Sequence, residues 1–214
     1  MPRISFSADP NPDKNSGLNE NSVDPDPFRQ FSAWFKDAVD SGVSEPEAMF
    51  LATAAKNGIP SGRIVLLKGF DSKGFVFFTN YSSRKGSEIE MNPFVAIAFH
   101  WKEMDRQVRI TGKADKIPGA ESDEYFASRS LESRISSMIS SQGKVIPDRN
   151  YLEKKFDEMK RGITGKEPER PATWGGFRII PATFEFWQSR PHRLHDRIQY
   201  RLTERKWIIE RLAP

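Results

Sequence analysis

The sequence contains no cysteine and only three histidines among its 214 residues. The absence of cysteine excludes disulfides, thiolate zinc sites, iron–sulfur clusters and cysteine nucleophiles. With only His100, His192 and His195 available, a three-histidine metal site is not expected either. We therefore expect no metal centre.

Long apolar segments are also missing. The longest apolar run, residues 94–99, is far shorter than the ~18 residues needed to cross a bilayer. The N-terminus has no signal-peptide-like stretch, and Asp9, Asp13 and Glu20 argue against an organellar presequence. These features predict a cytoplasmic protein with no membrane association.

The chain also has only a small excess of positive charge. The 33 Lys and Arg residues against 29 Asp and Glu residues give a net charge of +4. This mildly basic balance suits an anionic ligand, but it is small for a dedicated nucleic-acid-binding protein. Hydrophobic residues make up 37% and charged residues 29% of the chain, which is typical of a globular protein.

Residues 1–26 contain four of the 15 prolines and show no periodicity. They predict a mobile tail, followed by a single domain over residues 27–214. Asp26 and Pro27 are typical of a helix start, and Gly42 follows the expected helix end. One apolar face of this helix is predicted to contain Phe28, Phe31, Trp34, Phe35 and Val39.

The remaining pattern predicts short strands with helical insertions. Expected strands are residues 49–54, 62–70, 74–79, 95–101, 107–116, 175–180, 183–187, 193–202 and 207–211. Expected helices are residues 84–91, 119–129, 131–141 and 148–161. Strands and helices do not alternate regularly, so a mainly β fold is predicted, a mostly antiparallel barrel with helical insertions.

Two cationic clusters favour phosphate. Arg63 and Lys68 lie five apart on one predicted strand, so in a regular strand they face opposite sides. They therefore serve two neighbouring anions, or one anion if a bulge intervenes. Ser83, Arg84 and Lys85 begin a predicted helix, where backbone N–H groups favour anions. Solvated cations are the alternative in both places.

A third cluster, Tyr125, Arg129 and Ser133, is spaced four apart. On an unbroken helix these side chains share one face and address one anion. A break at residues 128–130 would separate them, and a solvated polar stripe is the alternative.

The C-terminal run 193–201 alternates as a strand does. Arg193, His195, Arg197 and Arg201 are predicted on one face, with Leu194, Ile198 and Tyr200 on the other. The cationic face is either solvated or covered by an anion, and Asp196 is available to pair with arginines of another element. His195 fits a substrate-orienting imidazole better than a metal ligand.

The sequence contains no motif for several other types of reaction. The sequence contains no Gly-x-Gly-x-x-Gly after a strand, no Walker loop and no Gly-x-Ser-x-Gly elbow. Glu88 and Glu90 lie two apart on a predicted helix and do not face each other. The residues alone thus predict a barrel that binds one or two phosphorylated aromatic ligands, without naming a reaction.

Ordered motifs over residues 24–214 resemble the pyridoxamine 5′-phosphate oxidase family. They are residues 63–68, 77–80, 83–85, 106–108, 125–129, 174–178, 185–188, 193–197 and 210–214. The resemblance implies an FMN-binding split β-barrel that works as a homodimer with flavin sites at the interface. It also implies oxidation of pyridoxamine or pyridoxine 5′-phosphate to pyridoxal 5′-phosphate by molecular oxygen, releasing hydrogen peroxide, and ammonia from the amine.

The resemblance further implies roles for individual residues. FMN contacts are expected from Arg63, Ile64, Val65, Leu66, Leu67, Lys68, Phe78, Thr79, Arg84, Lys85, Gln107, Gln142, Gly143, Trp187 and Arg197. Substrate phosphate contacts are expected from Lys68, Tyr125, Arg129 and Ser133, while Arg193 and His195 are expected at the pyridine ring as catalytic residues. Under this assignment Arg63 and Lys68 serve two different phosphates.

The sequence departs from the family at three places. It has no tyrosine before Tyr81, so a tail that closes over substrate is doubtful, and Phe78 and Gly143 replace a common tyrosine and serine. Three other functions compete: a phenazine-pathway flavin oxidase, a non-catalytic carrier of FMN or pyridoxal phosphate, and a nucleic-acid-binding protein. The intact set for a substrate phosphate argues against the first of these.

Overall fold

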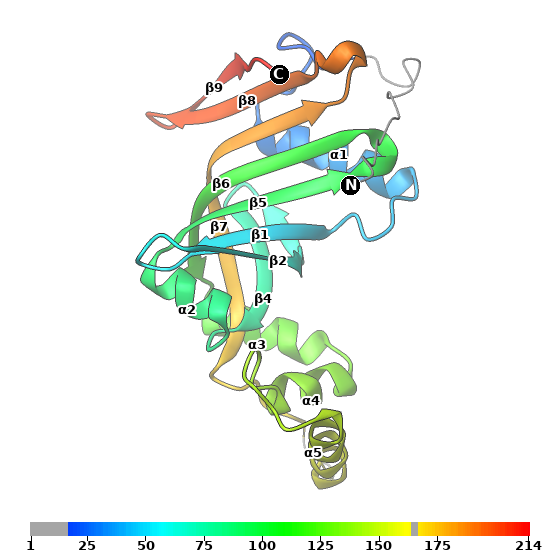
Figure 1. Ribbon diagram of the computed structural model, residues 1–214, viewed down its shortest axis with the longest axis vertical. Helices are drawn as coiled ribbons and strands as arrows, with labels where there is room; N and C mark the ends of the chain where they lie inside the picture. The colour runs from blue at the N-terminus through cyan, green and yellow to red at the C-terminus, as the bar shows by residue number, and fades with distance from the viewer. Residues whose placement is uncertain (1–16, 164–166) are drawn as a thin grey trace, which may run out of the picture. The chain divides into compact units, whose positions relative to one another are not determined.

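The computed structural model describes residues 17–163 and 167–214 (Figure 1). Its helices are α1 Pro27–Asp40, α2 Arg84–Met91, α3 Gly119–Ser128, α4 Leu131–Ile139 and α5 Arg149–Gly162, with short 3₁₀ turns at Lys102–Met104 and Pro191–Arg193. Its strands are β1 Ala48–Ala54, β2 Pro60–Leu66, β3 Gly69–Asp71, β4 Gly74–Asn80, β5 Phe94–Trp101, β6 Arg106–Lys116, β7 Trp174–Gln188, β8 Asp196–Thr203 and β9 Lys206–Arg211.

The strands hydrogen-bond in the order β2-β1-β5-β6-β7-β4-β3, and β8 pairs with both β7 and β9. The pairs β3–β4, β4–β7, β7–β8 and β8–β9 are antiparallel. The predicted mainly β, antiparallel architecture with helical insertions is therefore confirmed.

The chain divides into two compact units. Of the described residues, the first contains 17–50, 96–112 and 181–214, and the second contains 51–95, 113–163 and 167–180. Strands β1, β5, β6 and β7 each contribute residues to both units.

Only part of the predicted tail falls within the described residues, because residues 1–16 lie outside them. In residues 17–26, Leu18 and Val23 are buried. The Tyr200 hydroxyl donates a hydrogen bond to the Asp24 carbonyl oxygen at 2.7 Å. Ordered packing in the first unit thus begins before the predicted boundary at residue 27.

Helix α1 begins as its sequence predicts. The Asp26 carboxylate accepts a hydrogen bond from the Phe28 N–H, and Pro27 occupies the first turn. Phe31 and Trp34 are buried, but Val39 is 51% exposed, so its predicted place on the apolar face is wrong. Ala38 is buried instead, because it lies seven residues after Phe31, on the same face of the helix.

Two strand predictions needed correction in the second half of the chain. Predicted strands 175–180 and 183–187 form one strand, β7. Pro181 lies inside it without breaking it, since β7 pairs with β4 up to Ile179 and with β8 from Thr183. Proline lacks an N–H, and this position falls between the two pairings.

The predicted strand 193–202 is shorter than expected. Strand β8 begins at Asp196, and His192 and Arg193 have φ values of 58° and 61°, in the left-handed region that ends the extended run. The prediction that Arg193 and His195 share a strand face with Arg197 is therefore wrong. Of the three residues predicted on the opposite face, Ile198 and Tyr200 are buried, whereas Leu194 precedes β8 and is exposed.

Gly86 makes a close backbone contact that explains its place in α2. A Cβ added there would lie 2.2 Å from the Tyr81 carbonyl oxygen. We expect Gly86→Ala to lower the free energy of unfolding by about 1–3 kcal/mol, because backbone must shift to relieve the clash. Urea denaturation measures this loss.

Gly162 offers a matched control at the end of α5. A Cβ at this position meets no heavy atom of the described residues within 4 Å. Gly162→Ala is therefore expected to preserve or raise stability, since alanine is the better helix former. Equal stability of the two variants would contradict the close-contact explanation.

Candidate functional site

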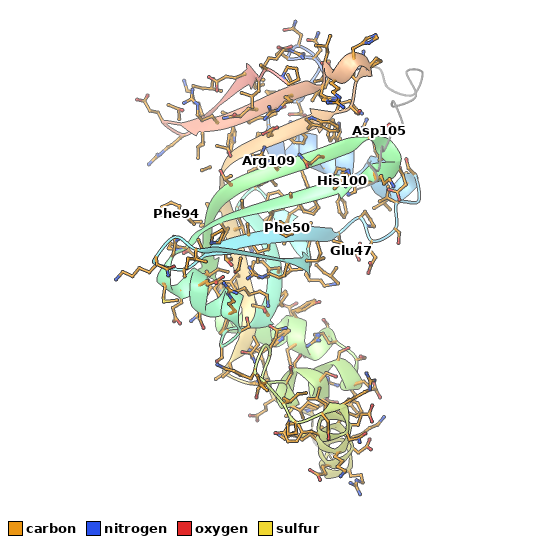
Figure 2. All side chains as sticks on the ribbon, viewed as in Figure 1. Glu47, Phe50, Phe94, His100, Asp105 and Arg109 are labelled. Atoms are coloured by element: carbon orange, nitrogen blue, oxygen red, sulfur yellow. The ribbon has the colours of Figure 1, made fainter. Side chains whose placement is uncertain are left out.

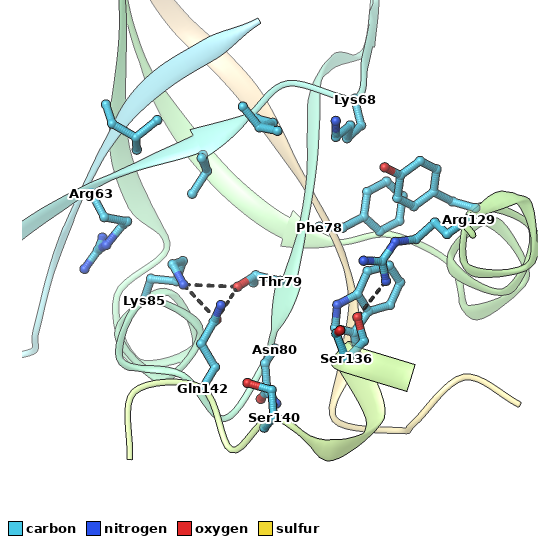
Figure 3. A pocket seen from close by; sticks show the side chains of 16 residues that line it. Arg63, Lys68, Phe78, Thr79, Asn80, Lys85, Arg129, Ser136, Ser140 and Gln142 are labelled. Carbon is cyan, nitrogen blue, oxygen red and sulfur yellow. Dashed lines mark hydrogen bonds between the residues drawn. The ribbon is translucent and has the colours of Figure 1, made fainter. Parts of the chain in front are cut away.

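The second unit contains a cavity of about 610 Å³, a size suited to a small-molecule ligand (Figure 3). It is lined by Arg63, Ile64, Val65, Leu66, Lys68, Phe78, Thr79, Asn80, Lys85, Tyr125, Arg129, Ser136, Ser137, Ser140, Gln142 and Trp174. The structure thus brings most of the predicted second-unit site residues together. Figure 3 shows Arg63 and Lys85 on one side of the cavity, and Lys68 and Arg129 on the other.

The end of β2 explains how Arg63 and Lys68 reach the same cavity. The predicted single strand 62–70 is wrong: β2 stops at Leu66 and β3 begins at Gly69. The strict alternation of side chains ends where β2 ends. Both cations therefore line one cavity although they lie five residues apart.

Lys85 is the most buried cation of the cavity, with 9% of its surface exposed. It lies in the first turn of α2, which Ser83 caps by accepting a hydrogen bond from the Gly86 N–H. Its Nζ donates to Gln142 Oε1 at 2.9 Å, Thr79 Oγ1 at 3.2 Å and Ser83 Oγ at 3.4 Å.

These partners of Lys85 are all neutral oxygens, and among the described residues no carboxylate forms an ion pair with it. Burial and the nearby charge of Arg63 lower the pKa of Lys85. A buried ammonium next to a second cation is unfavourable without a counter-charge. This side of the cavity therefore favours an anion.

Hydrogen bonds to hydroxyl groups fix the position of the Arg63 guanidinium. Its Nη1 donates to Thr53 Oγ1 at 2.5 Å and its Nη2 donates to Ser61 Oγ at 2.5 Å. Arg84, by contrast, does not line the cavity; its exposed side chain pairs with Glu88 at 2.8 Å. Of the second-unit cations predicted to contact FMN, Arg63, Lys68 and Lys85 line the cavity and Arg84 does not.

The opposite side of the cavity combines a cation with aromatic rings. The Tyr125 ring stacks on Phe78 with centroids 3.9 Å apart, and the Arg129 guanidinium lies 4.8 Å from the centre of the Trp174 ring. Arg129 Nη1 donates to Ser137 Oγ at 2.6 Å. Burial lowers the pKa of Arg129 and raises the pKa of Tyr125.

The helix that carries Tyr125 is interrupted. Helix α3 ends at Ser128, Arg129 is extended, and Ser130 caps α4 by accepting from the Ser133 N–H. The arrangement of Tyr125, Arg129 and Ser133 on one unbroken helical face is therefore not found. Serine competes with helix continuation because its hydroxyl can bond to nearby backbone, and here the Ser130 hydroxyl caps a new helix.

Ser133 itself does not line the cavity, and its hydroxyl contacts Ser130 Oγ at 2.9 Å. Its role in substrate binding stays a prediction. Ser136 and Ser137 line the cavity instead, and sequence reasoning missed them. The repeated serines around residue 136 were the available signal, but serine repeats are also typical of solvated helix faces.

Leu67 and Gly143 likewise do not line the cavity. Leu67 is buried, and Gly143 has a φ of 85°, in the left-handed region that favours glycine. Their predicted FMN contacts stay predictions, as does that of Arg84.

Five further predicted site residues belong to the first unit: Gln107, Trp187, Arg193, His195 and Arg197. The Trp187 and His195 rings have centroids 4.7 Å apart, and His195 Nδ1 accepts a hydrogen bond from the Arg190 N–H at 3.1 Å. Neutral His195 therefore carries its proton on Nε2, which is left as a donor.

Hydrogen bonds within the first unit fix the Arg197 side chain. Its Nε donates to Glu185 Oε1 at 2.9 Å and its Nη1 donates to the Ala213 carbonyl oxygen at 2.8 Å. Arg193 is exposed. Asp196 pairs with Arg190 and Arg211, as the alternative reading of that carboxylate predicted.

Within the described ranges, no helix has the length and apolar character to cross a membrane. The same residues contain no group of three or more His, Asp or Glu side chains placed to hold a metal ion.

The ionisation of Glu88, which lies next to Arg63 on the cationic side of the cavity, makes the stability of the protein depend on pH in acid. Burial alone would raise the pKa of Glu88, but hydrogen bonds from Ser61, Thr53 and Arg84 outweigh it and lower the pKa to about 2. The ordinary value is 4.5, so the stabilisation is complete above about pH 4.5 and is lost as the pH falls towards 2.

We expect Glu88→Gln to flatten the pH dependence of stability between pH 4.5 and 2, removing about 1–3 kcal/mol of variation. Urea denaturation at several pH values measures this slope. Glu90→Gln is the control, because Glu90 lies on the same helix with its side chain 67% exposed. Equal slopes in wild type and Glu88→Gln would contradict the expectation.

Comparison with protein families gives two matches. A family model described as pyridoxamine 5′-phosphate oxidase matches residues 35–161. A second, described as the pyridoxine 5′-phosphate oxidase C-terminal dimerisation region, matches residues 174–214. Together they cover most of each unit.

Curated relatives are similar over nearly the whole chain. A pyridoxine/pyridoxamine 5′-phosphate oxidase of Cupriavidus pinatubonensis is 51% identical over 198 residues, covering 92% of this chain and 93% of the relative. One of Rippkaea orientalis is 52% identical over 199 residues, covering 92% and 94%.

Solved structures share the fold. PhzG from Burkholderia lata 383, in complex with tetrahydrophenazine-1-carboxylic acid, has a TM-score of 0.88 at 28% identity and covers 94% of this chain and 100% of its own. A pyridoxamine 5′-phosphate oxidase-related, FMN binding protein from Nostoc punctiforme has a TM-score of 0.71 at 19% identity, covering 88% and 98%. These likenesses confirm the predicted split β-barrel.

Proposed function

The chain belongs to the pyridoxamine 5′-phosphate oxidase family, and from this premise we propose that it oxidises pyridoxamine and pyridoxine 5′-phosphates to pyridoxal 5′-phosphate with bound FMN. One observation carries the proposal. A single cavity has cations on two sides, Arg63 with Lys85 and Lys68 with Arg129, which suits two phosphorylated molecules bound together.

The cofactor side fits FMN by the chemistry of its donors. Arg63 and Lys85 would bind the phosphate, because both are cations and Lys85 pairs with no carboxylate of the described residues. The apolar run Ile64, Val65 and Leu66 would lie along the flavin ring. Bound FMN would accept a hydride from the substrate and return the electrons to molecular oxygen, giving hydrogen peroxide.

The substrate side would bind the second phosphate through Lys68, Tyr125 and Arg129, with Ser133 as the further predicted contact. Arg129 is fixed by Ser137 and by the Trp174 ring, so its guanidinium is oriented before substrate arrives. This orientation would place the exocyclic carbon of the substrate for reaction.

A homodimer would complete the site. The C-terminal match to a dimerisation region supports dimer formation. Phe50, a large apolar side chain on β1, is 46% exposed and available for burial against a partner (Figure 2). We place the FMN sites at the dimer interface, with Gln107, Trp187 and Arg197 as further FMN contacts, and Arg193 and His195 at the pyridine ring.

Two variants test these first-unit assignments. Arg193→Ala is expected to lower turnover about tenfold while FMN stays bound, because loss of a guanidinium stacked on the substrate ring costs about 1–2 kcal/mol. Arg197→Ala is expected to yield flavin-poor protein. Visible spectra of the purified variants, alongside turnover, check both. Parallel loss of flavin and activity in Arg193→Ala, or a fully yellow Arg197→Ala, would contradict the assignments.

The structural likeness to PhzG supports a second candidate, oxidation of a larger tricyclic substrate. The phosphate-directed set Lys68, Tyr125 and Arg129 favours the phosphorylated vitamers instead. The test is to add pyridoxine 5′-phosphate in air to purified protein and follow aldehyde and peroxide together. Equal formation of both supports the proposed oxidase. Yellow protein without turnover favours the phenazine-type oxidase or a carrier, and protein that cannot take up FMN refutes the proposal.

A further inference from the structure

We propose that Glu88 is a positioning residue that acts through Arg63 to set the affinity of the protein for the phosphate of FMN. This inference rests on the proposed flavin site and extends it to a carboxylate that does not line the cavity. An acidic residue behind a phosphate-binding cation is unexpected, because its charge opposes the anion. Its contacts explain why it is there.

Glu88 is buried, with 3% of its surface exposed, and both carboxylate oxygens are bonded. Oε2 accepts hydrogen bonds from Thr53 Oγ1 and Ser61 Oγ, each at 2.5 Å. Oε1 accepts from Arg84 Nε at 2.8 Å. The carboxylate thus joins β1, β2 and α2 at one point.

The same two hydroxyls contact Arg63. Thr53 Oγ1 accepts from Arg63 Nη1 and Ser61 Oγ accepts from Arg63 Nη2. Arg63 Nη2 also lies 3.4 Å from Glu88 Oε2. The guanidinium is therefore fixed by a set of hydroxyls that Glu88 itself holds.

The direction of the protons makes this arrangement specific. A hydroxyl has one proton to donate, and a guanidinium has only donors. When Thr53 and Ser61 donate to the carboxylate, their lone pairs point to Arg63. A glutamine at residue 88 has only one acceptor oxygen. Its NH₂ group is a donor and would face either the donating hydroxyls or the donating Arg84. At least one hydroxyl then turns away from its present partner, and Arg63 loses its fixed position.

The experiment measures the dissociation constants of FMN and riboflavin for deflavinated wild type, Glu88→Gln and the control Glu90→Gln. Riboflavin lacks the phosphate, so it reports on the rest of the site. We expect Glu88→Gln to weaken the affinity for FMN about tenfold, because the charge-assisted contact of Arg63 with the phosphate becomes less well oriented. The affinity for riboflavin should be nearly unchanged. Glu90→Gln is expected to bind both flavins as wild type does.

The opposite outcomes overturn the inference. If Glu88 acted only as a distant negative charge, its removal would tighten FMN. If it served only the fold, Glu88→Gln would weaken FMN and riboflavin equally. Wild-type protein that binds FMN no better than riboflavin would instead refute the proposed phosphate site itself, which separates the two failures.

Coupling to Arg63 gives an independent test. In an Arg63→Ala background, Glu88→Gln should have no further effect on FMN affinity, because the group it positions is gone. Ser61→Ala serves if Glu88→Gln does not fold, since it removes one hydroxyl of the set at a partly exposed position. It should weaken FMN selectively, by about threefold. Additive effects in the double variant, or unselective weakening in Ser61→Ala, would overturn the inference.

Discussion

Lys85→Met is expected to raise the dissociation constant for FMN about 100-fold. Loss of a charge-assisted hydrogen bond to phosphate costs about 1.5–3 kcal/mol, and each 1.4 kcal/mol is a factor of ten. Methionine keeps the apolar part of this buried side chain, so the packing around residue 85 is largely preserved. Gln142 keeps a donor for its Oε1, because Thr79 Oγ1 lies 3.0 Å away.

Fluorescence titration of the deflavinated protein measures this change. Lys73→Met is the control, because Lys73 is an exposed cation outside the cavity lining. It should bind FMN as wild type does. If Lys85→Met retained FMN through purification with wild-type affinity, the phosphate would have to lie elsewhere.

Arg129→Ala is expected to lower kcat/KM for pyridoxine 5′-phosphate by about 100-fold or more. The variant loses a charged contact to the substrate phosphate and also the orientation that Ser137 and Trp174 give the guanidinium. FMN affinity should stay close to that of wild type, since Arg129 lies on the other side of the cavity from Lys85 (Figure 3).

Pyridoxine without phosphate is the internal control for this variant. It makes no phosphate contact, so its weak turnover should be the same in wild type and Arg129→Ala. Arg149→Ala tests charge alone, because Arg149 lies on α5 outside the cavity lining with its side chain 89% exposed. A similar fall for both substrates would mean that Arg129 serves the structure of the site rather than the phosphate.

Much of the local structure could be predicted because it depends on residues that are neighbours in the chain. Asp26 and Ser83 begin their helices as expected, since a capping side chain needs only the next few backbone N–H groups. The strand from Arg106 to Lys116 follows its alternation closely. Predictions were wrong where an end depended on distant partners, as at Leu66 in β2 and at Pro181 in β7.

The candidate site likewise contains residues that the sequence could predict and residues that it could not. Cation and aromatic motifs identified Arg63, Lys85, Tyr125 and Arg129, all of which line the cavity. Ser136 and Ser137 were missed, because a serine that lines a cavity and a serine that faces solvent look alike in a sequence. Glu88 was considered only as a pair with Glu90, which it does not face. Its actual partners, Thr53 and Ser61, come from two strands far from it in the chain.

By itself, the sequence determined the antiparallel β class, the helix starts and the family, since these rest on periodicity, capping and ordered motifs. Only the tertiary structure decided that Arg63 and Lys68 line one cavity, and that Tyr125 and Arg129 line it although α3 ends at Ser128. It also decided that the buried Glu88 carboxylate lies next to Arg63. The physical reason is that side-chain direction at a strand end, and the partners of a buried charge, are set by packing between segments distant in the chain.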